Sequence, residues 1–178
     1  LLFGICHAVA HAQYLDSIKK ELEQINISSL RLRQNVMPII KRFGYASHQM
    51  DSLNSVISEF DSLALNKVEN IISTYGWLGK SEIGETANST LFIVIQHAED
   101  NRVREKFYPL LEASVNKGES NRSDLAAMQD RILVNNGHNQ LYGTQSKNDG
   151  KLFPVEDPKR LNKRRKQVGL KKIKANLD

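Results

Sequence analysis

The stretch GETANSTLFIVIQHAED, residues 84–100, decides how the fold is interpreted. Its central apolar run has the length of a buried strand, whereas the whole segment has the length of a buried helix. We favour the helix, over residues 85–98, because apolar side chains recur at helical spacing on one face. These side chains are Ala87, Leu91, Ile95 and Ala98. The last turn of the predicted helix carries Gln96 and His97.

Helical spacing of apolar residues also dominates the chain on both sides of this stretch. We predict further helices over residues 14–36, 62–75, 102–117 and 123–136. Gly76 and Gly137 should end the second and the fourth of these, because glycine readily adopts the left-handed conformation that caps a helix. Pro109 should kink the third or mark a restart. Ser123 is the expected N-cap of the fourth.

The hydrophobic period changes after residue 136. The pieces QLYGTQ and KLFPV flank SKNDG, and the dipeptide Asp149-Gly150 is favoured in tight hairpin turns. We therefore predict a short β-hairpin at about residues 140–155. A last basic helix should follow, with Asp157 as N-cap, Pro158 in the first turn and Gly169 at the end. The predicted fold class is mainly α: a helical bundle with a short C-terminal β-hairpin and a last basic helix.

Composition favours one globular domain. A chain of 178 residues with 40% hydrophobic content can bury one core, but hardly two. The net charge of +5 is concentrated at one end, because residues 157–178 hold nine Lys or Arg residues against two acidic ones. This tail lacks interleaved aromatics for base stacking, so we interpret it as a solvated helix face and do not expect a nucleic-acid partner. Contact with an anionic envelope polymer is the alternative.

The first residues have the character of an export signal. An apolar run ends in Ala10-His11-Ala12, the A-x-A pattern of a signal-peptidase site. We interpret residues 1–12 as a truncated signal-peptide remnant and residues 13–178 as a single helical domain, exported to the periplasm or the cell exterior. A lipoprotein is disfavoured, because Ile5 precedes Cys6 where a small residue is needed. No later segment has the apolar length of a membrane span.

Loop lengths predict where polar residues meet. Short loops make neighbouring helices antiparallel, so helices two apart in sequence share an end of the bundle. Gln96 and His97 should therefore lie beside Asp130 and Arg131, with the start of the helix near Asp61 at the same end. One face of the first hairpin strand should close over them: Gln140, Tyr142 and Thr144.

These residues offer definite chemistry. His97 can move a proton near neutral pH or hydrogen-bond a ligand. Asp130 has apolar neighbours one turn away, so its carboxylate should be partly buried and need Arg131, His97 or backbone N–H groups as partners. Arg131 suits a carboxylate or phosphate on a ligand. Tyr142 adds a donor, and Gly143 lets a ligand approach the backbone.

Five pieces of the sequence, in this order, resemble an uncharacterised bacterial family, domain of unknown function 6624. They are YGW at 75–77, QHA at 96–98, DR at 130–131, QLYGTQ at 140–145 and RRKQVGL at 164–170, within a similarity from about Asp61 to Ile173. The resemblance implies no activity. It implies that the family relies on nine positions: Gln96, His97, Asp130, Arg131, Gln140, Tyr142, Gly143, Thr144 and Arg165.

The chain departs from the family pattern at two places. The family often has an Asp-Gln pair ahead of Arg33, whereas this chain has Ser29 and Leu30. If that pair takes part in a reaction, this member is impaired or only binds. Leu78 stands where the family commonly has proline.

Two functions follow from these residues. In the first, an exported protein binds a small or polymeric anionic ligand in a polar pocket, and His97 serves as the acid/base group of a hydrolase or lyase. His97, Asp130 and Tyr142 are then catalytic, and the ligand-binding residues are Gln96, Arg131, Gln140, Gly143, Thr144 and Arg165. In the second, the protein is a non-catalytic envelope module, and the same residues staple the hairpin to the bundle.

Each residue also has a plain structural interpretation. His97 can be a satisfied buried histidine, and Asp130-Arg131 a structural ion pair. No cofactor is predicted. No metal is predicted either, because His48, His97 and His138 are far apart in sequence and show no metal-ligand spacing.

Overall fold

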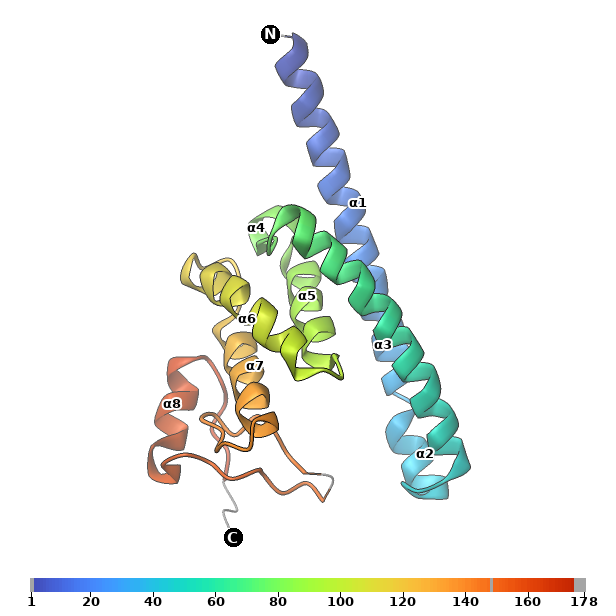
Figure 1. Ribbon diagram of the computed structural model, residues 1–178, viewed down its shortest axis with the longest axis vertical. Coiled ribbons are helices and arrows are strands. Elements are labelled where there is room, and N and C mark those ends of the chain that lie inside the picture. The colour runs from blue at the N-terminus through green and yellow to red at the C-terminus, as the bar shows by residue number, and fades with distance from the viewer. Residues whose placement is uncertain (1, 148, 175–178) are drawn as a thin grey trace. The chain divides into compact units, whose positions relative to one another are not determined.

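The structure is a computed structural model that describes residues 2–147 and 149–174 (Figure 1), with side chains from residue 12 onward. The helices are α1 (Leu2–Arg33), α2 (Val36–Phe43), α3 (His48–Tyr75), α4 (Lys80–Ile83), α5 (Glu85–His97), α6 (Asn101–Asn116), α7 (Arg122–Asn135), the 3-10 turn η1 (Pro158–Arg160) and α8 (Leu161–Gln167). No helix in this part of the chain has the length and apolar character that crossing a bilayer requires.

The chain forms two compact units that divide between Ala98 and Glu99. We describe each unit by itself. The proposed division into a signal remnant and one domain over residues 13–178 stays a prediction.

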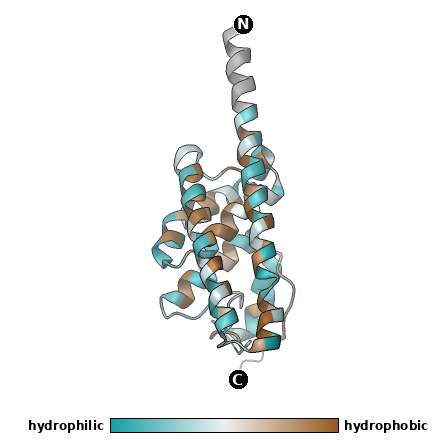
Figure 2. Cartoon of the chain, turned by 90° about the vertical axis from the view of Figure 1, so that its right-hand side faces the viewer, coloured by the Kyte–Doolittle hydropathy of each residue, from teal (hydrophilic) through white to brown (hydrophobic). Residues whose placement is uncertain are grey.

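The first unit is built on α1, α3 and α5, which pack against one another. The predicted helix at residues 85–98 is confirmed, because α5 runs from Glu85 to His97. Figure 2 shows apolar residues recurring along the helices between polar ones. On α5 the side chains of Leu91 and Ile95 are completely buried, and burial of each such side chain stabilises the fold by roughly 1.5–3 kcal/mol.

A turn after α3 carries the YGW piece and leads into α4. Gly76 has a φ of 75°, and its N–H donates to the carbonyl of Ile72, so glycine ends this helix as predicted. The buried Asn88 of α5 donates from Nδ2 to the carbonyl of Leu78 at 2.7 Å. This bond ties the turn to α5.

The second unit begins with α6 and α7, which pack against each other. Asn101 at the start of α6 contacts Asn135 and Asn136 at the end of α7, so the two helices are antiparallel. The buried apolar side chains of the pair are Phe107, Leu111, Val115, Ala126 and Met128. Helix α6 continues through Pro109 without a restart.

The predicted β-hairpin at residues 140–155 is wrong. The described part of this segment contains only two isolated bridges, Gln140 with Val155 and Ser146 with Leu152, and no strand. Asn148, in the predicted turn, lies outside the described residues. The two arms still share backbone hydrogen bonds, from the N–H of Lys147 to the carbonyl of Lys151 and from the N–H of Phe153 to the carbonyl of Gln145. The ladder does not continue because the N–H groups of Leu141, Tyr142 and Thr144 donate to the side chain of Asp130.

Other predicted helix starts are also wrong. Helix α3 begins at His48 and not near residue 62, so Asp61 lies within this helix instead of at its start. Asp157 has a φ of 39° and makes no side-chain capping bond, and a 3-10 turn separates it from α8. Its carbonyl accepts from the N–H of Arg160, which closes this tight turn. Helix α7 begins at Arg122, so Asn121 and not Ser123 is at the N-cap.

Candidate functional site

The predicted site residues fall in both units. Gln96 and His97 lie at the C-terminal end of α5 in the first unit, whereas the other seven belong to the second unit. Their convergence on one site stays a prediction. Within each unit, however, the structure gives the contacts of these residues in detail.

The carboxylate of Asp130 is the centre of a polar network in the second unit. Asp130 lies on α7 and is completely buried. Its oxygens accept from the N–H groups of Leu141 (2.7 Å), Tyr142 (3.0 Å) and Thr144 (3.0 Å) and from the Oγ1 of Thr144 (2.9 Å). The sequence predicted a partly buried carboxylate with Arg131, His97 or backbone N–H groups as partners. The structure shows complete burial, and of the three predicted kinds of partner it shows the backbone N–H groups. Hydrogen bonds to one carboxylate therefore hold the backbone of this loop in a tight curve around the side chain of Asp130.

A second buried side chain braces the same loop from inside. The amide of Gln140, which is completely buried, donates from Nε2 to the carbonyls of Gln145 (2.9 Å) and Phe153 (2.8 Å). Its Oε1 accepts from the N–H of Gln145 at 2.9 Å. The loop from Gln140 to Gln145 is therefore held by side chains that replace the missing strand ladder.

Two arginines of α8 hold the outer side of this loop. Arg165 is buried and donates to the carbonyls of Lys171 (2.6 Å), Tyr142 (2.6 Å) and Gly143 (3.3 Å). Arg164 donates to the carbonyls of Leu141, Glu156 and Asp157. Arg165 thus folds back onto the predicted site residues, where it contacts main-chain oxygens.

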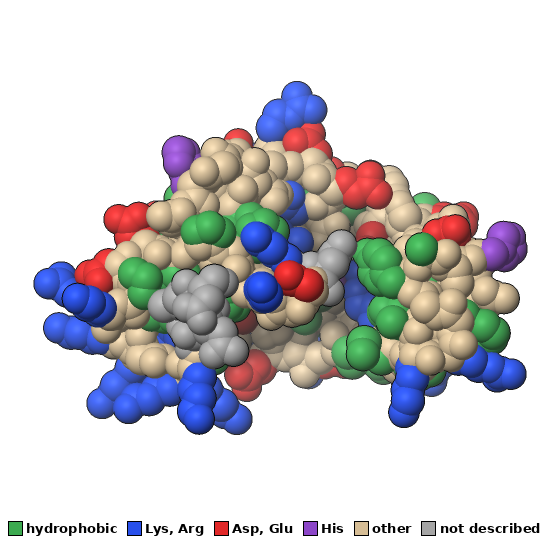
Figure 3. Space-filling model, turned by 90° about the horizontal axis from the view of Figure 1, so that it is seen from below, with side chains coloured by type: hydrophobic (Ala, Val, Ile, Leu, Met, Phe, Trp, Pro, Cys, Tyr) green, Lys and Arg blue, Asp and Glu red, His purple; other side chains and the backbone are tan. Residues whose placement is uncertain are grey.

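The remaining basic residues of the tail are solvated. Lys159, Lys163 and Lys166 are exposed. Lys and Arg side chains gather on the face of the second unit that carries α8, seen from below in Figure 3. This arrangement agrees with a solvated helix face from which Arg165 is the buried exception.

Gly143 lies at the tightest point of the loop. It has a φ of 64°, and a Cβ added there would lie 3.3 Å from Cδ1 of Ile173 and 3.5 Å from Cδ1 of Leu161. Glycine is required both by the backbone conformation and by the close approach of these side chains.

Arg131 stands next to the buried carboxylate in sequence but does not pair with it. The guanidinium is partly buried, and its Nε is buried without a hydrogen-bond partner in the described part of the chain. Burial lowers the pKa of Arg131. Burial also lowers the pKa of Arg104 on α6, and the charge of Arg131 lowers it further. The positive charge of Arg131 therefore disfavours the cationic form of Arg104, whereas Asp100 and Glu105 favour it.

Two phenols belong to the same unit. Burial raises the pKa of Tyr142, and the charge of Asp130 adds to the shift. Burial also raises the pKa of Tyr108, with smaller contributions from Glu112 and Tyr142. Both phenols therefore stay protonated near neutral pH and can donate a hydrogen bond. Sequence reasoning missed Arg104 and Tyr108, although their spacing of four residues places both on one face of α6.

The first unit contains a separate cluster around His97. The Nη2 of Arg33 lies 2.9 and 2.6 Å from the two carboxylate oxygens of Asp61 and 3.0 Å from the Nδ1 of His97. Its Nη1 donates to the Oγ of Ser29 at 2.7 Å. Helices α1, α3 and α5 each supply a member, so the cluster joins the packed helices of this unit.

The contact with Arg33 determines which ring nitrogen of His97 carries the proton. A guanidinium has only donors, so Nδ1 of His97 must accept and cannot carry a proton. In neutral His97 the proton is then on Nε2. The sequence placed Asp61 at the same end of the bundle as His97, and the structure shows that both side chains contact Arg33, a link that the sequence did not predict.

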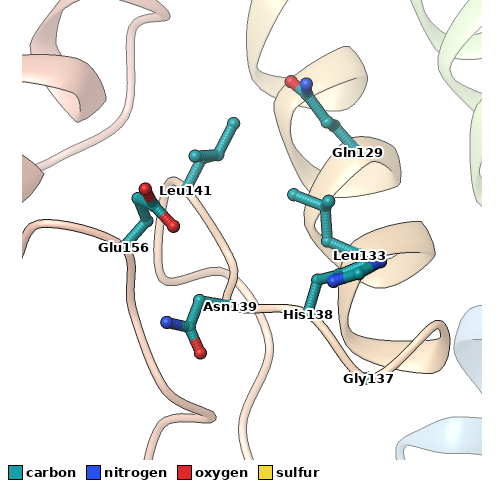
Figure 4. Close-up of a pocket in the computed structure, with 7 residues that line it drawn as sticks. All are labelled: Gln129, Leu133, Gly137, His138, Asn139, Leu141 and Glu156. Atoms are coloured by element: carbon teal, nitrogen blue, oxygen red, sulfur yellow. The ribbon is translucent and has the colours of Figure 1, made fainter.

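A pocket of about 640 Å³ opens in the second unit after α7 (Figure 4). Its lining includes Gln129, Leu133, His138, Asn139, Leu141 and Glu156. None of the nine predicted site residues lines it. The described residues contain no group of three or more His, Cys, Asp or Glu side chains that could hold a metal ion.

Comparisons with known proteins agree with a family of unknown function. The model of one family, described as "Family of unknown function (DUF6624)", matches residues 19–177. No curated protein and no solved structure matches the chain significantly. The matched region spans residues of both units.

Proposed function

Because the chain belongs to the DUF6624 family, for which no activity is known, we propose a function from the side chains alone. The protein binds a small or polymeric anionic ligand, and His97 donates a hydrogen bond to a ligand oxygen on which charge develops. The reaction class is hydrolase or lyase. The apolar run that ends in Ala10-His11-Ala12 supports export to the periplasm or the cell exterior as part of the proposal.

One observation carries this proposal: Arg33 contacts both Asp61 and His97. A general base would need a free lone pair on Nε2, and the contact at Nδ1 instead leaves the proton of the neutral ring on Nε2. His97 is therefore better suited to donate toward a carbonyl or oxyanion than to accept a proton from a nucleophile. This narrows the acid/base role that the sequence suggested.

The contacts of His97 support an imidazole ring that is held in one orientation. The side chains of Arg33 and Asp61 are 27% and 23% exposed, so their interaction is partly shielded from water. Ser29 occupies the place where the family often has Asp, and it accepts from Arg33 without adding charge. Asp61 therefore provides the carboxylate that neutralises Arg33.

The tautomer gives a direct test. With ¹⁵N-labelled histidine, we expect the His97 ring to show a pyridine-type Nδ1 and a protonated Nε2 in NMR spectra at a pH where the ring is neutral. Arg33→Met removes the donor, so the spectrum should move toward a mixture of tautomers. His138 is exposed and serves as the internal control. If Nδ1 carries the proton in the unaltered protein, the proposal that Nε2 of His97 donates to the ligand is wrong.

Ligand binding gives the second test of the same proposal. A panel of anionic metabolites and cell-wall fragments should contain a compound that raises the melting temperature. His97→Ala should weaken its binding by about tenfold or more, the usual effect of losing a hydrogen bond to a charged group. His138→Ala should leave the affinity unchanged. Equal losses in the two variants would contradict a site at His97.

A non-catalytic structural module is the second candidate. The hydrogen bonds that Asp130 and Arg165 already make within the protein favour it. Both charged side chains are buried and bonded to the main chain of the loop. In that case His97→Ala and Tyr142→Phe should both lower the melting temperature strongly, and no compound of the panel should raise it.

A further inference from the structure

Helix α2 and the segments beside it expose large apolar side chains. Five of the nine large apolar side chains that are exposed in the described part of the chain lie between Ile27 and Tyr45. Met37, Phe43 and Tyr45 are 69%, 46% and 59% exposed. Large apolar side chains exposed close together are typical of a surface that another body covers.

The packing of α2 leaves its apolar residues incompletely covered. Helix α2 packs against α3 at one end of the first unit (Figure 1). None of its eight residues is buried, and Val36, Ile39 and Ile40 are only partly buried. A helix of this length is marginal by itself in water, so it depends on the surfaces that it contacts. A further surface against α2 would therefore stabilise it.

The same part of the chain is basic. Residues 24–50, which lie between Glu23 and Asp51, contain no acidic residue and four Lys or Arg residues. One of the four, Arg33, pairs with Asp61. The other three are exposed: Arg31, Lys41 and Arg42. This end of the first unit therefore carries an excess of positive charge.

The positive charges are interleaved with the apolar side chains. Lys41 and Arg42 directly precede Phe43, and the guanidinium carbon of Arg42 lies 5.0 Å from the centre of the Phe43 ring. Seen from below, hydrophobic side chains and Lys or Arg side chains both reach the surface at this end of the first unit (Figure 3). Such a surface is complementary to one with an apolar interior and negatively charged groups outside.

The charge distinguishes between the surfaces that could cover α2. The core of a protein–protein interface is depleted in Lys, whereas helices on a membrane surface combine Lys or Arg with Phe and Leu. A second copy of the chain would bring equal positive charges together across a symmetric contact. Residues 157–174 of the second unit are basic as well. Anionic lipid headgroups avoid both repulsions and attract the cations.

We propose that the α2 surface, formed by Met37, Lys41, Arg42, Phe43 and Tyr45, binds a bilayer that contains anionic lipids. The three apolar side chains enter the boundary between headgroups and acyl chains, where aromatic residues are favoured. Lys41 and Arg42 contact the headgroups. Eight residues are too few to cross a bilayer, so α2 lies on its surface. This inference goes beyond the proposed function and does not depend on His97.

Flotation of the full chain with vesicles tests the charged part of the proposal. The vesicles contain phosphatidylcholine alone or an equimolar mixture with phosphatidylglycerol. We expect stronger binding to the mixed vesicles, and added salt should weaken it by screening. Lys41→Gln with Arg42→Gln should weaken this binding by about fivefold for each charge removed. Lys163→Gln with Lys166→Gln removes two exposed charges from α8 and should leave it nearly unchanged.

A second pair of variants tests the apolar part without changing the charge. Met37→Ser with Phe43→Ser should weaken binding to the mixed vesicles by roughly tenfold or more, because apolar surface no longer leaves water. Leu63→Ser with Leu110→Ser removes two exposed apolar side chains elsewhere and should leave binding unchanged. All four positions are exposed, so the substitutions should cost little stability. Every variant keeps residues 1–13, so the apolar run at the start contributes equally.

Amide hydrogen exchange locates the contact. On mixed vesicles the exchange of residues 36–45 should slow, whereas that of residues 161–167 should not. Slower exchange in α8 alone, or equal losses in the α2 variants and their controls, overturns the proposal. A chain that sediments as a dimer and becomes monomeric with Met37→Ser and Phe43→Ser has a second copy on the α2 surface, and this result overturns the proposal as well.

Discussion

Replacement of Asp130 by asparagine is expected to lower the free energy of unfolding by about 3–5 kcal/mol, the usual cost of removing one side of a buried charged network. The carboxylate accepts from the N–H groups of Leu141, Tyr142 and Thr144. An asparagine has one oxygen fewer, and its NH₂ group would point a donor at these donors. Urea unfolding of the full chain measures the change.

Amide hydrogen exchange locates the effect of this substitution. The N–H groups of Leu141, Tyr142 and Thr144 should be protected in the unaltered protein and exchange far faster in Asp130→Asn. Asp149→Asn makes the same chemical change at an exposed position and should alter stability by less than about 0.5 kcal/mol. If the two variants unfold at the same urea concentration, Asp130 does not hold the loop.

The second large effect is expected from Arg165→Met, at about 2–4 kcal/mol of lost stability. The side chain donates to the carbonyls of Tyr142, Gly143 and Lys171 and is 7% exposed. Methionine keeps much of the volume but leaves these acceptors without a donor, and each buried unsatisfied group costs about 1–3 kcal/mol. Limited proteolysis between Gln140 and Pro158 should accelerate with the same variant.

A neighbouring arginine provides the control. The side chain of Arg160 is 76% exposed and pairs with Asp157 on the surface, where an ion pair is worth about 0–1 kcal/mol. Arg160→Met should therefore leave stability and proteolysis nearly unchanged. A similar loss in both variants would mean that the positive charge of the tail matters and the bonds of Arg165 do not.

The helices were predictable where hydrophobic spacing and length agreed. The stretch from Glu85 to His97 is too long for a single strand, and its apolar positions fall on one helical face, so length resolved the ambiguity. The prediction for the segment from Gln140 to Val155 was wrong because it relied on local pattern alone. Alternating apolar and polar residues around Asp149-Gly150 suit a hairpin, but the pattern does not show that side chains distant in sequence occupy the backbone donors.

The same limit applies to the polar clusters. Apolar neighbours predicted that Asp130 is buried and needs donors, because that signal is local to α7. The link from Arg33 to Asp61 and His97 joins residues that are 28 and 64 positions apart. Loop lengths placed Asp61 and His97 at one end of the bundle, but they could not show which cation joins them.

The absence of a ladder in the loop also has a consequence for self-association. An exposed hairpin strand presents a row of unpaired N–H and C=O groups on which another chain can add a strand. Here the N–H groups of Leu141, Tyr142 and Thr144 donate to the carboxylate of Asp130. The carbonyls of Tyr142 and Gly143 accept from Arg165. Because these donors and acceptors are already bonded within the chain, the loop offers a second chain fewer free backbone groups than the edge of a hairpin would.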